Sequence, residues 1–172
     1  TYKAQAAILL QKHAERSRTR TAYDVAIEKE GAVFVVRAEP AIRAIVKDLM
    51  KGRSASDIAR AFHNGLAQAC VRVCQAIRKE TGLKTACLSG GVFQNRLFLE
   101  LLARGLRKNN FALYYNELLP ANDRGVSLGQ AALANALVSR RVTSDKRQAT
   151  SDKLDNQTQA HVSHIELVAC SL

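Results

Sequence analysis

The chain has 172 residues, of which 47% are hydrophobic and 24% charged, a composition typical of one folded domain with its own core. It contains no run of about 18 apolar residues, which excludes a membrane-spanning helix, and its first residues lack the pattern of a secretory signal. The formal net charge of +11 would attract anionic partners, whether nucleotide, RNA or an acidic protein; the alternative is a solvated basic surface, or a face that meets an acidic part of a longer protein.

The first third of the chain is expected to form a helix, a hairpin and another helix. Apolar residues recur at helical spacing over residues 2–15, and residues 22–29 and 32–38 alternate as strands do, with Gly31 between them. Pro40 suits the first turn of a helix that runs to Met50. The hairpin is therefore predicted to lie between two helices.

A long helix is expected next. Ser54 is placed to cap it, with Asp57 in a variant of the capping-box position, and Gly82 is placed to end it. Within this helix His63 has no histidine or acid at a neighbouring turn, so a structural role is favoured over metal binding.

The rest of the body is predicted to be an α/β unit. Residues 85–88 and 111–115 are short buried strands, and residues 95–108 and 126–142 are helices. Two strands joined through a helix are expected to pair in parallel, with a right-handed crossover. Residues 1–142 thus form the folded domain, while residues 143–172 are polar and are expected to be a disordered tail.

The turn after the first of these strands is a candidate phosphate site. Ser89, Gly90 and Gly91 lead into a helix start, where backbone N–H groups attract anions and glycines allow close approach. Asn95 at the helix start is a candidate nucleotide contact. The alternatives are a turn required only by strand-to-helix geometry and, for Asn95, a helix cap.

The turn before the last helix is a candidate metal site. Asp123 is its only acid, lying between Asn122 and Gly125, and a carboxylate in such a loop can bind a divalent cation that bridges phosphates. An Asx-turn or a helix cap is the alternative. No activated nucleophile and no paired carboxylates are visible, so no catalytic residue is assigned.

The charge distribution and the cysteines limit which partners, metal sites and cellular locations the sequence supports. The basic residues form no dense run and no aromatic stacking set accompanies them, so nucleic-acid binding is not favoured. None of the four cysteines forms a Cys-x-x-Cys pair, which argues against a zinc ribbon. Thiols without a secretion signal indicate a reducing, cytoplasmic location.

Three segments carry a family resemblance: residues 58–64 (IARAFHN), 88–95 (LSGGVFQN) and 122–130 (NDRGVSLGQ). In these motifs, which occur in the family's order, the chain resembles the C-terminal part of the HypF carbamoyltransferases of [NiFe]-hydrogenase maturation. The resemblance covers residues 1–142. It implies the second ribonuclease-H-like half of a domain of the actin-like ATPase and sugar-kinase superfamily.

The resemblance also implies a function. An adenylate (ATP or carbamoyl-adenylate) would lie against Ser89, Gly90, Gly91 and Asn95. Asp123 would complete a divalent-metal site whose histidines belong to the other half of the domain. The carbamoyl group would pass to the C-terminal cysteine of a HypE-like acceptor protein. Because the chain is expected to hold only part of the transferase, it is expected to be inactive by itself.

Two departures from the family pattern and one alternative function remain open. The family usually has Glu-Gly where this chain has Lys3-Ala4, and Gly where it has Arg124; either change could weaken nucleotide or metal binding. The alternative is a non-enzymatic interaction module that docks on an acidic partner or completes a split transferase. Apolar surface facing the other half-domain would also allow self-association.

Overall fold

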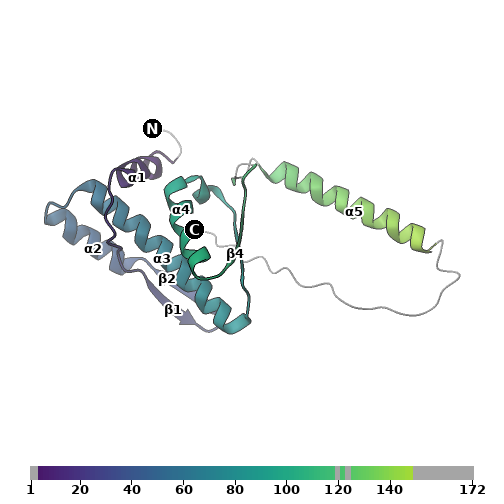
Figure 1. Cartoon of the computed structure of the whole chain (residues 1–172), viewed down its shortest axis with the longest axis horizontal. Coiled ribbons are helices and arrows are strands. Elements are labelled where there is room, and N and C mark those ends of the chain that lie inside the picture. Colours follow the sequence, from purple (N-terminus) through teal and green to yellow (C-terminus); the bar gives the residue numbers. More distant parts are fainter. Residues whose placement is uncertain (1–3, 119–120, 123–124, 149–172) are drawn as a thin grey trace.

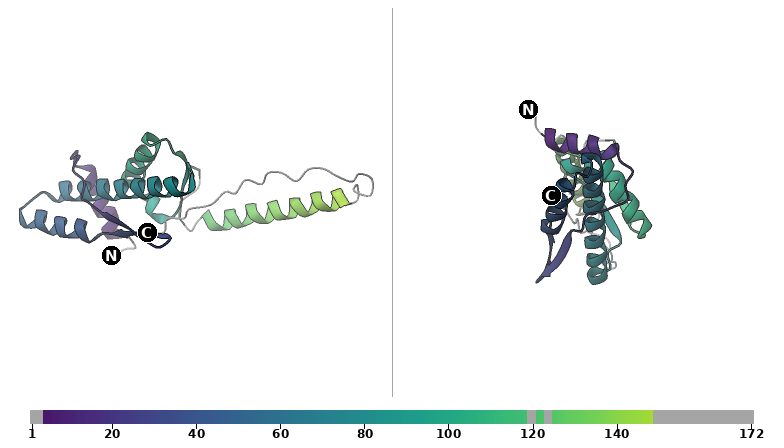
Figure 2. Two further views of the ribbon diagram at one scale, coloured as in Figure 1. Left: turned by 90° about the horizontal axis from the view of Figure 1, so that it is seen from below. Right: turned by 90° about the vertical axis from the view of Figure 1, so that its left-hand side faces the viewer.

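The computed structural model describes residues 4–118, 121–122 and 125–148, with side chains described as far as residue 139. A long central helix, α3 (Ala55–Thr81), organises the body (Figure 1). Two further helices, α2 (Glu39–Met50) and α4 (Arg96–Lys108), lie on opposite sides of it (Figure 2). Ser54 caps α3 as predicted, since its Oγ accepts the Asp57 N–H at 3.1 Å, and Gly82 ends the helix at φ 76°.

The chain before the hairpin crosses α3 at close range. Helix α1 (Gln5–Glu15) is followed by an extended segment in which the Tyr23 N–H donates to Ala61 O at 3.2 Å. A Cβ at Gly65 would lie 2.2 Å from Tyr23 O, so only glycine fits at this crossing. Asn64, which is buried, donates from Nδ2 to Thr19 O and to Thr21 O.

The predicted hairpin forms, with a later start. Strands β1 (Ala26–Glu30) and β2 (Val33–Arg37) pair antiparallel, and Gly31 turns between them at φ 61°. Tyr23 and Val25 alternate like strand residues but pack in a core cluster with α2 and α3 instead. Packing against the helices therefore takes the first residues of the predicted strand out of the hairpin.

The C-terminal half forms the expected parallel unit. Strand β3 (Thr85–Leu88) pairs in parallel with β4 (Ala112–Tyr115), in a register that runs from Thr85↔Ala112 to Leu88↔Tyr115. Helix α4 connects the two strands and is preceded by a short 3-10 helix, η1 (Gly91–Gln94), which the sequence did not indicate. The main core cluster joins α3, α4, η1 and this sheet, and its members are Ala67, Val71, Leu88, Phe93, Phe98, Leu102, Leu106 and Phe111.

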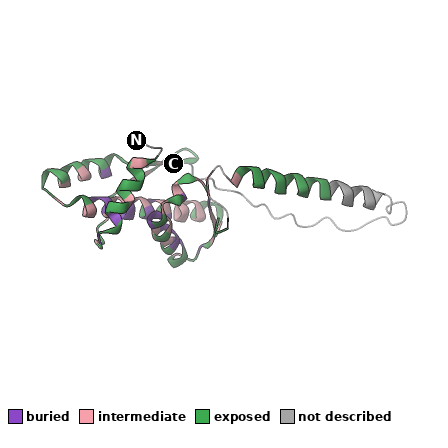
Figure 3. Ribbon diagram, turned by 90° about the horizontal axis from the view of Figure 1, so that it is seen from above, coloured by how far each residue is buried: buried purple, intermediate pink, exposed green. Residues whose placement is uncertain are grey.

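The last helix, α5 (Val126–Gln148), extends away from the body (Figure 1). It continues past Val142, where the sequence analysis ends the domain, and its described side chains are exposed along most of its length (Figure 3). Residues 149–172, which make up most of the predicted tail, lie outside the described residues. No helix in the described part of the chain is both long and apolar enough to cross a membrane.

Candidate functional site

The two candidate turns meet at one edge of the parallel sheet. Because β3 and β4 run in parallel and Leu88 pairs with Tyr115, both strands end at the same edge. The Gly90 N–H in the first turn donates to Ala121 O in the second at 2.8 Å. In open α/β sheets, ligands bind beyond the carboxyl ends of the strands. The structure therefore brings the two motifs together where such a site is expected.

The first turn has a conformation that requires glycine. Gly90 lies at φ 115° and ψ 162°, outside the regions open to L-residues. Its carbonyl accepts the Phe93 N–H at 3.2 Å, and the buried Phe93 ring stacks on Phe98 with 6.0 Å between ring centroids. The turn is thus anchored in the core by η1 while Gly90 sets its direction.

The outer side of this turn is open. Ser89 and Gly91 are exposed, and a Cβ added at Gly90 or Gly91 would meet no atom within 4 Å. The first N–H groups of a helical turn have no acceptor within that turn. The open side of the turn leaves room beside the backbone, and contact of a phosphate with Ser89, Gly90 and Gly91 stays a prediction.

Asn95 connects the turn to α4 and α3. Its Oδ1 accepts the Phe98 N–H at 3.0 Å and so caps α4, while its Nδ2 lies 2.9 Å from His63 Nε2. The cap that the sequence analysis left open as an alternative is present. Contact between Asn95 and a nucleotide stays a prediction.

His63 is the residue whose part in this arrangement the sequence analysis did not foresee. It is 3% exposed, and its Nδ1 lies 2.8 Å from Ala59 O on its own helix. Burial lowers the pKa of His63, with a smaller lowering by Arg60. The ring is therefore neutral, with the Nδ1–H donating to Ala59 O and Nε2 accepting from Asn95. The one sequence feature that could have indicated this role is the position of His63 on the inner face of α3.

The candidate metal ligand cannot be placed. Asp123 and Arg124 lie outside the described residues, although the flanking Gly125 N–H donates to Asn122 O at 3.0 Å. Among the described residues, no group of three or more His, Cys, Asp or Glu side chains could hold a metal ion. One carboxylate does not make a divalent-metal site, so no chemical step is assigned to a metal here.

Comparison with protein families gives one match across most of the chain. The family described as carbamoyltransferase, Kae1-like domain, second subdomain, matches residues 1–130. Carbamoyltransferase HypF of Synechocystis sp. is 30% identical over 131 residues, which are 76% of this chain and 16% of that protein. A tRNA N6-adenosine threonylcarbamoyltransferase of Bordetella petrii is 36% identical over 97 residues, 54% of this chain and 28% of the relative.

Solved structures agree with these matches. Full-length HypF in a phosphate- and nucleotide-bound form superposes with a TM-score of 0.73 and 38% identity, covering 80% of this chain and 18% of that one. HypF of T. kodakarensis gives a TM-score of 0.68 and 28% identity, covering 81% and 18%. The chain thus spans less than a fifth of the length of each HypF protein compared.

Proposed function

The chain belongs to the Kae1-like carbamoyltransferase domain family as a second subdomain, and from this premise we propose that it forms the nucleotide-binding half of a carbamoyl-transfer site. Its fold is the mixed α/β fold expected from the sequence. One of the similar HypF structures is described as phosphate- and nucleotide-bound, which supports a nucleotide as the ligand class.

One observation carries the proposal: the hydrogen bond from Gly90 N–H to Ala121 O, which joins the two turns at the carboxyl end of the sheet. A nucleotide phosphate would lie against the exposed side of Ser89, Gly90 and Gly91. There, backbone N–H groups other than that of Gly90, which already donates to Ala121 O, would offset the negative charge of the phosphate. The His63–Asn95 contact would hold the turn in place while the ligand binds.

The proposed reaction transfers a carbamoyl group from carbamoyl-adenylate to a cysteine thiolate of a HypE-like acceptor. The thiolate sulfur attacks the carbamoyl carbon, a C–S bond forms, the bond from that carbon to the phosphate oxygen breaks, and AMP leaves with the electron pair. N–H donors at the turn would stabilise the departing phosphate. We propose that this chain binds the adenylate but needs further residues for the transfer, because it spans only 16% of a HypF relative.

Calorimetry with ATP or a non-hydrolysable adenylate analogue and Mg²⁺ tests the proposal. The Gly90→Ala variant should bind about tenfold more weakly or worse, because alanine is strained at φ 115° and the turn would change direction. Gly31→Ala is the matched control, since it places alanine at a positive φ in the distant hairpin, and it should bind as the parent does. Asp123→Ala shows whether the second turn contributes through its carboxylate.

Two results would count against a nucleotide site. The first is the absence of binding heat for the parent chain with any adenine nucleotide. The second is equal affinity of the parent, Gly90→Ala and Gly31→Ala chains, which would mean that nucleotide binds elsewhere.

A further inference from the structure

Helix α2 carries exposed apolar side chains on its outer side. Ile42, Val46, Leu49 and Met50 are 58%, 49%, 57% and 86% exposed, respectively. Ile42, Val46 and Met50 are four residues apart in turn, so they form one row along the helix. Helices of soluble domains usually bury such a row, and here it faces away from the core.

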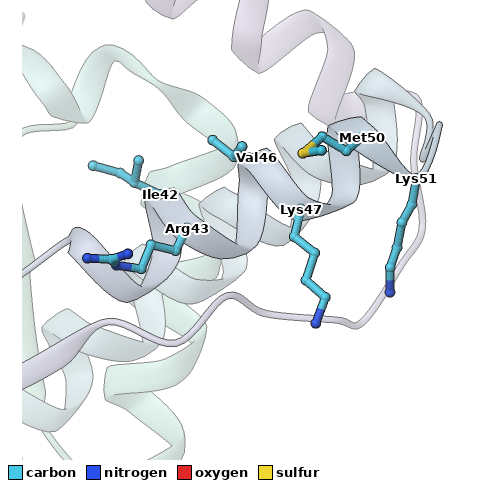
Figure 4. A pocket seen from close by; sticks show the side chains of 6 residues that line it. All are labelled: Ile42, Arg43, Val46, Lys47, Met50 and Lys51. Atoms are coloured by element: carbon cyan, nitrogen blue, oxygen red, sulfur yellow. The ribbon is translucent and has the colours of Figure 1, made fainter.

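A row of basic side chains lies beside the apolar row. Arg43, Lys47 and Lys51 follow Ile42, Val46 and Met50 by one residue each, and Figure 4 shows the two sets projecting to different sides of α2. All six residues line one surface hollow. Arg43 forms an ion pair with Glu39 at 2.6 Å, whereas Lys47 and Lys51 form no salt bridge within the described residues.

The inner side of α2 packs against the rest of the domain. Ala41 is buried, and Ala44 and Ile45 pack on the cluster formed with Tyr23 and α3. At the end of the helix, Asp48 accepts from Tyr23 Oη at 2.8 Å and from Arg53 at 2.7 Å. The outer face is therefore already ordered before anything binds, which reduces the entropy cost of docking.

We propose that this outer face of α2 is a docking surface for an acidic amphipathic helix of a protein partner. Apolar side chains of the partner would cover Ile42, Val46 and Met50, while carboxylates on one flank would face Arg43, Lys47 and Lys51. The basic row beside the apolar row favours an acidic helix as the partner, because opposite charges across an interface favour binding. The surface belongs to α2, whereas the nucleotide turn follows β3, so the inference does not depend on nucleotide binding.

Fluorescence anisotropy with two labelled synthetic helices tests the proposal. Both helices carry the same row of leucines, flanked by glutamates in one and by lysines in the other. The acidic helix should bind the full chain, more weakly as salt rises, and the basic helix should not. Val46→Glu, and separately the double change Lys47→Glu with Lys51→Glu, should each weaken binding about tenfold or more.

Control variants place one new charge or one reversed charge away from α2. Val33→Glu alters an exposed valine of β2, and Lys84→Glu alters an exposed lysine beyond the far end of α3; both should bind as the parent does. The proposal is overturned if Val46→Glu and the double variant bind the acidic helix normally, or if the basic helix binds equally well. It is also overturned if the chain binds phosphatidylserine vesicles through Val46 but ignores the acidic helix, since the surface would then be a lipid contact.

Discussion

His63 is a buried residue whose protonation would conflict with its hydrogen bond to Asn95. A proton on Nε2 would face the Nδ2 donor of Asn95, while Nδ1 already donates to Ala59 O. Turning the Asn95 amide to accept from His63 would take Oδ1 away from the Phe98 N–H and remove the cap of α4. The charge of this ring is thus coupled to the start of α4.

Stability should therefore fall as the pH falls below about 6.5. Burial lowers the pKa of His63 from its usual 6.5, so the unfolded chain takes up this proton before the folded chain does. The stabilisation from the neutral ring is complete above pH 6.5 and is lost as the pH falls toward the lowered pKa. Urea unfolding between pH 7.5 and pH 5 measures this loss.

The variant His63→Gln isolates the contribution of this one ring, because it leaves every other residue of the chain unchanged. It should cost about 1–3 kcal/mol at pH 7.5 through the buried hydrogen bonds and should flatten the pH dependence. Identical pH slopes for parent and variant would show that His63 does not titrate differently on folding. Asp48 and Asp57 have pKa values lowered below 3.8 by hydrogen bonds, so their effects belong to a more acidic range.

Ala4 has a backbone conformation that normally belongs to glycine. It precedes α1 at φ 65° and ψ 14°, which costs an L-residue about 1–2 kcal/mol. The variant Ala4→Gly should therefore stabilise the chain by about 1 kcal/mol, as measured by chemical unfolding. The same change at Ala7, an exposed position inside α1, should destabilise it by about 1 kcal/mol. The test is whether the two substitutions change the free energy of unfolding in opposite directions. A loss of stability in both variants would contradict the prediction.

At the scale of elements, the N-terminus of α4 is the point where the candidate site depends on one side chain. Asn95→Ala removes the cap and leaves His63 Nε2 without its amide partner, so it should cost about 1–3 kcal/mol. Gln94→Ala, at an exposed neighbouring position, should change stability by less than about 0.5 kcal/mol. Equal unfolding midpoints for the two variants would show that the cap contributes nothing.

The sequence predicted the elements whose signals are local. Ser54, Pro40 and Gly82 mark helix ends through their own backbone and side-chain chemistry, and the parallel pair follows from strand, helix and strand in order. The boundary at Tyr23 could not be predicted, because its backbone N–H bonds to Ala61 O on a helix 38 positions away.

The candidate site could be predicted from the sequence to a similar extent. The turn at Gly90 was visible as a glycine-rich corner, but its hydrogen bond to Ala121 depends on the register of β3 and β4, which only the packed core fixes. The link from His63 to Asn95 joins α3 to α4 across 32 positions and has no local signature. The place of Asp123 stays a prediction because that residue lies outside the described part of the chain.

At the scale of the whole molecule, apolar side chains besides those on the outer face of α2 are exposed among the described residues. Leu128, Leu133 and Leu137 of α5 are 51–62% exposed, and Tyr114 on the parallel sheet is 64% exposed. Parallel sheets are usually covered on both faces, and exposed patches of this kind mark contact sites. Both surfaces suit contact with another protein segment or with a second copy of this chain.

We therefore expect the isolated chain to self-associate in a concentration-dependent manner. Replacing Leu133 and Leu137 together with glutamate places charge on the exposed side of α5 and should shift the chain toward monomer, as measured by sedimentation equilibrium across a range of protein concentrations. Val33→Glu, which adds charge to an equally exposed valine of the hairpin, should leave the association unchanged. A monomeric parent chain at every concentration would contradict the expectation. If the α5 variant still associates but the Met50→Glu variant does not, the contact between copies lies on α2 instead of α5.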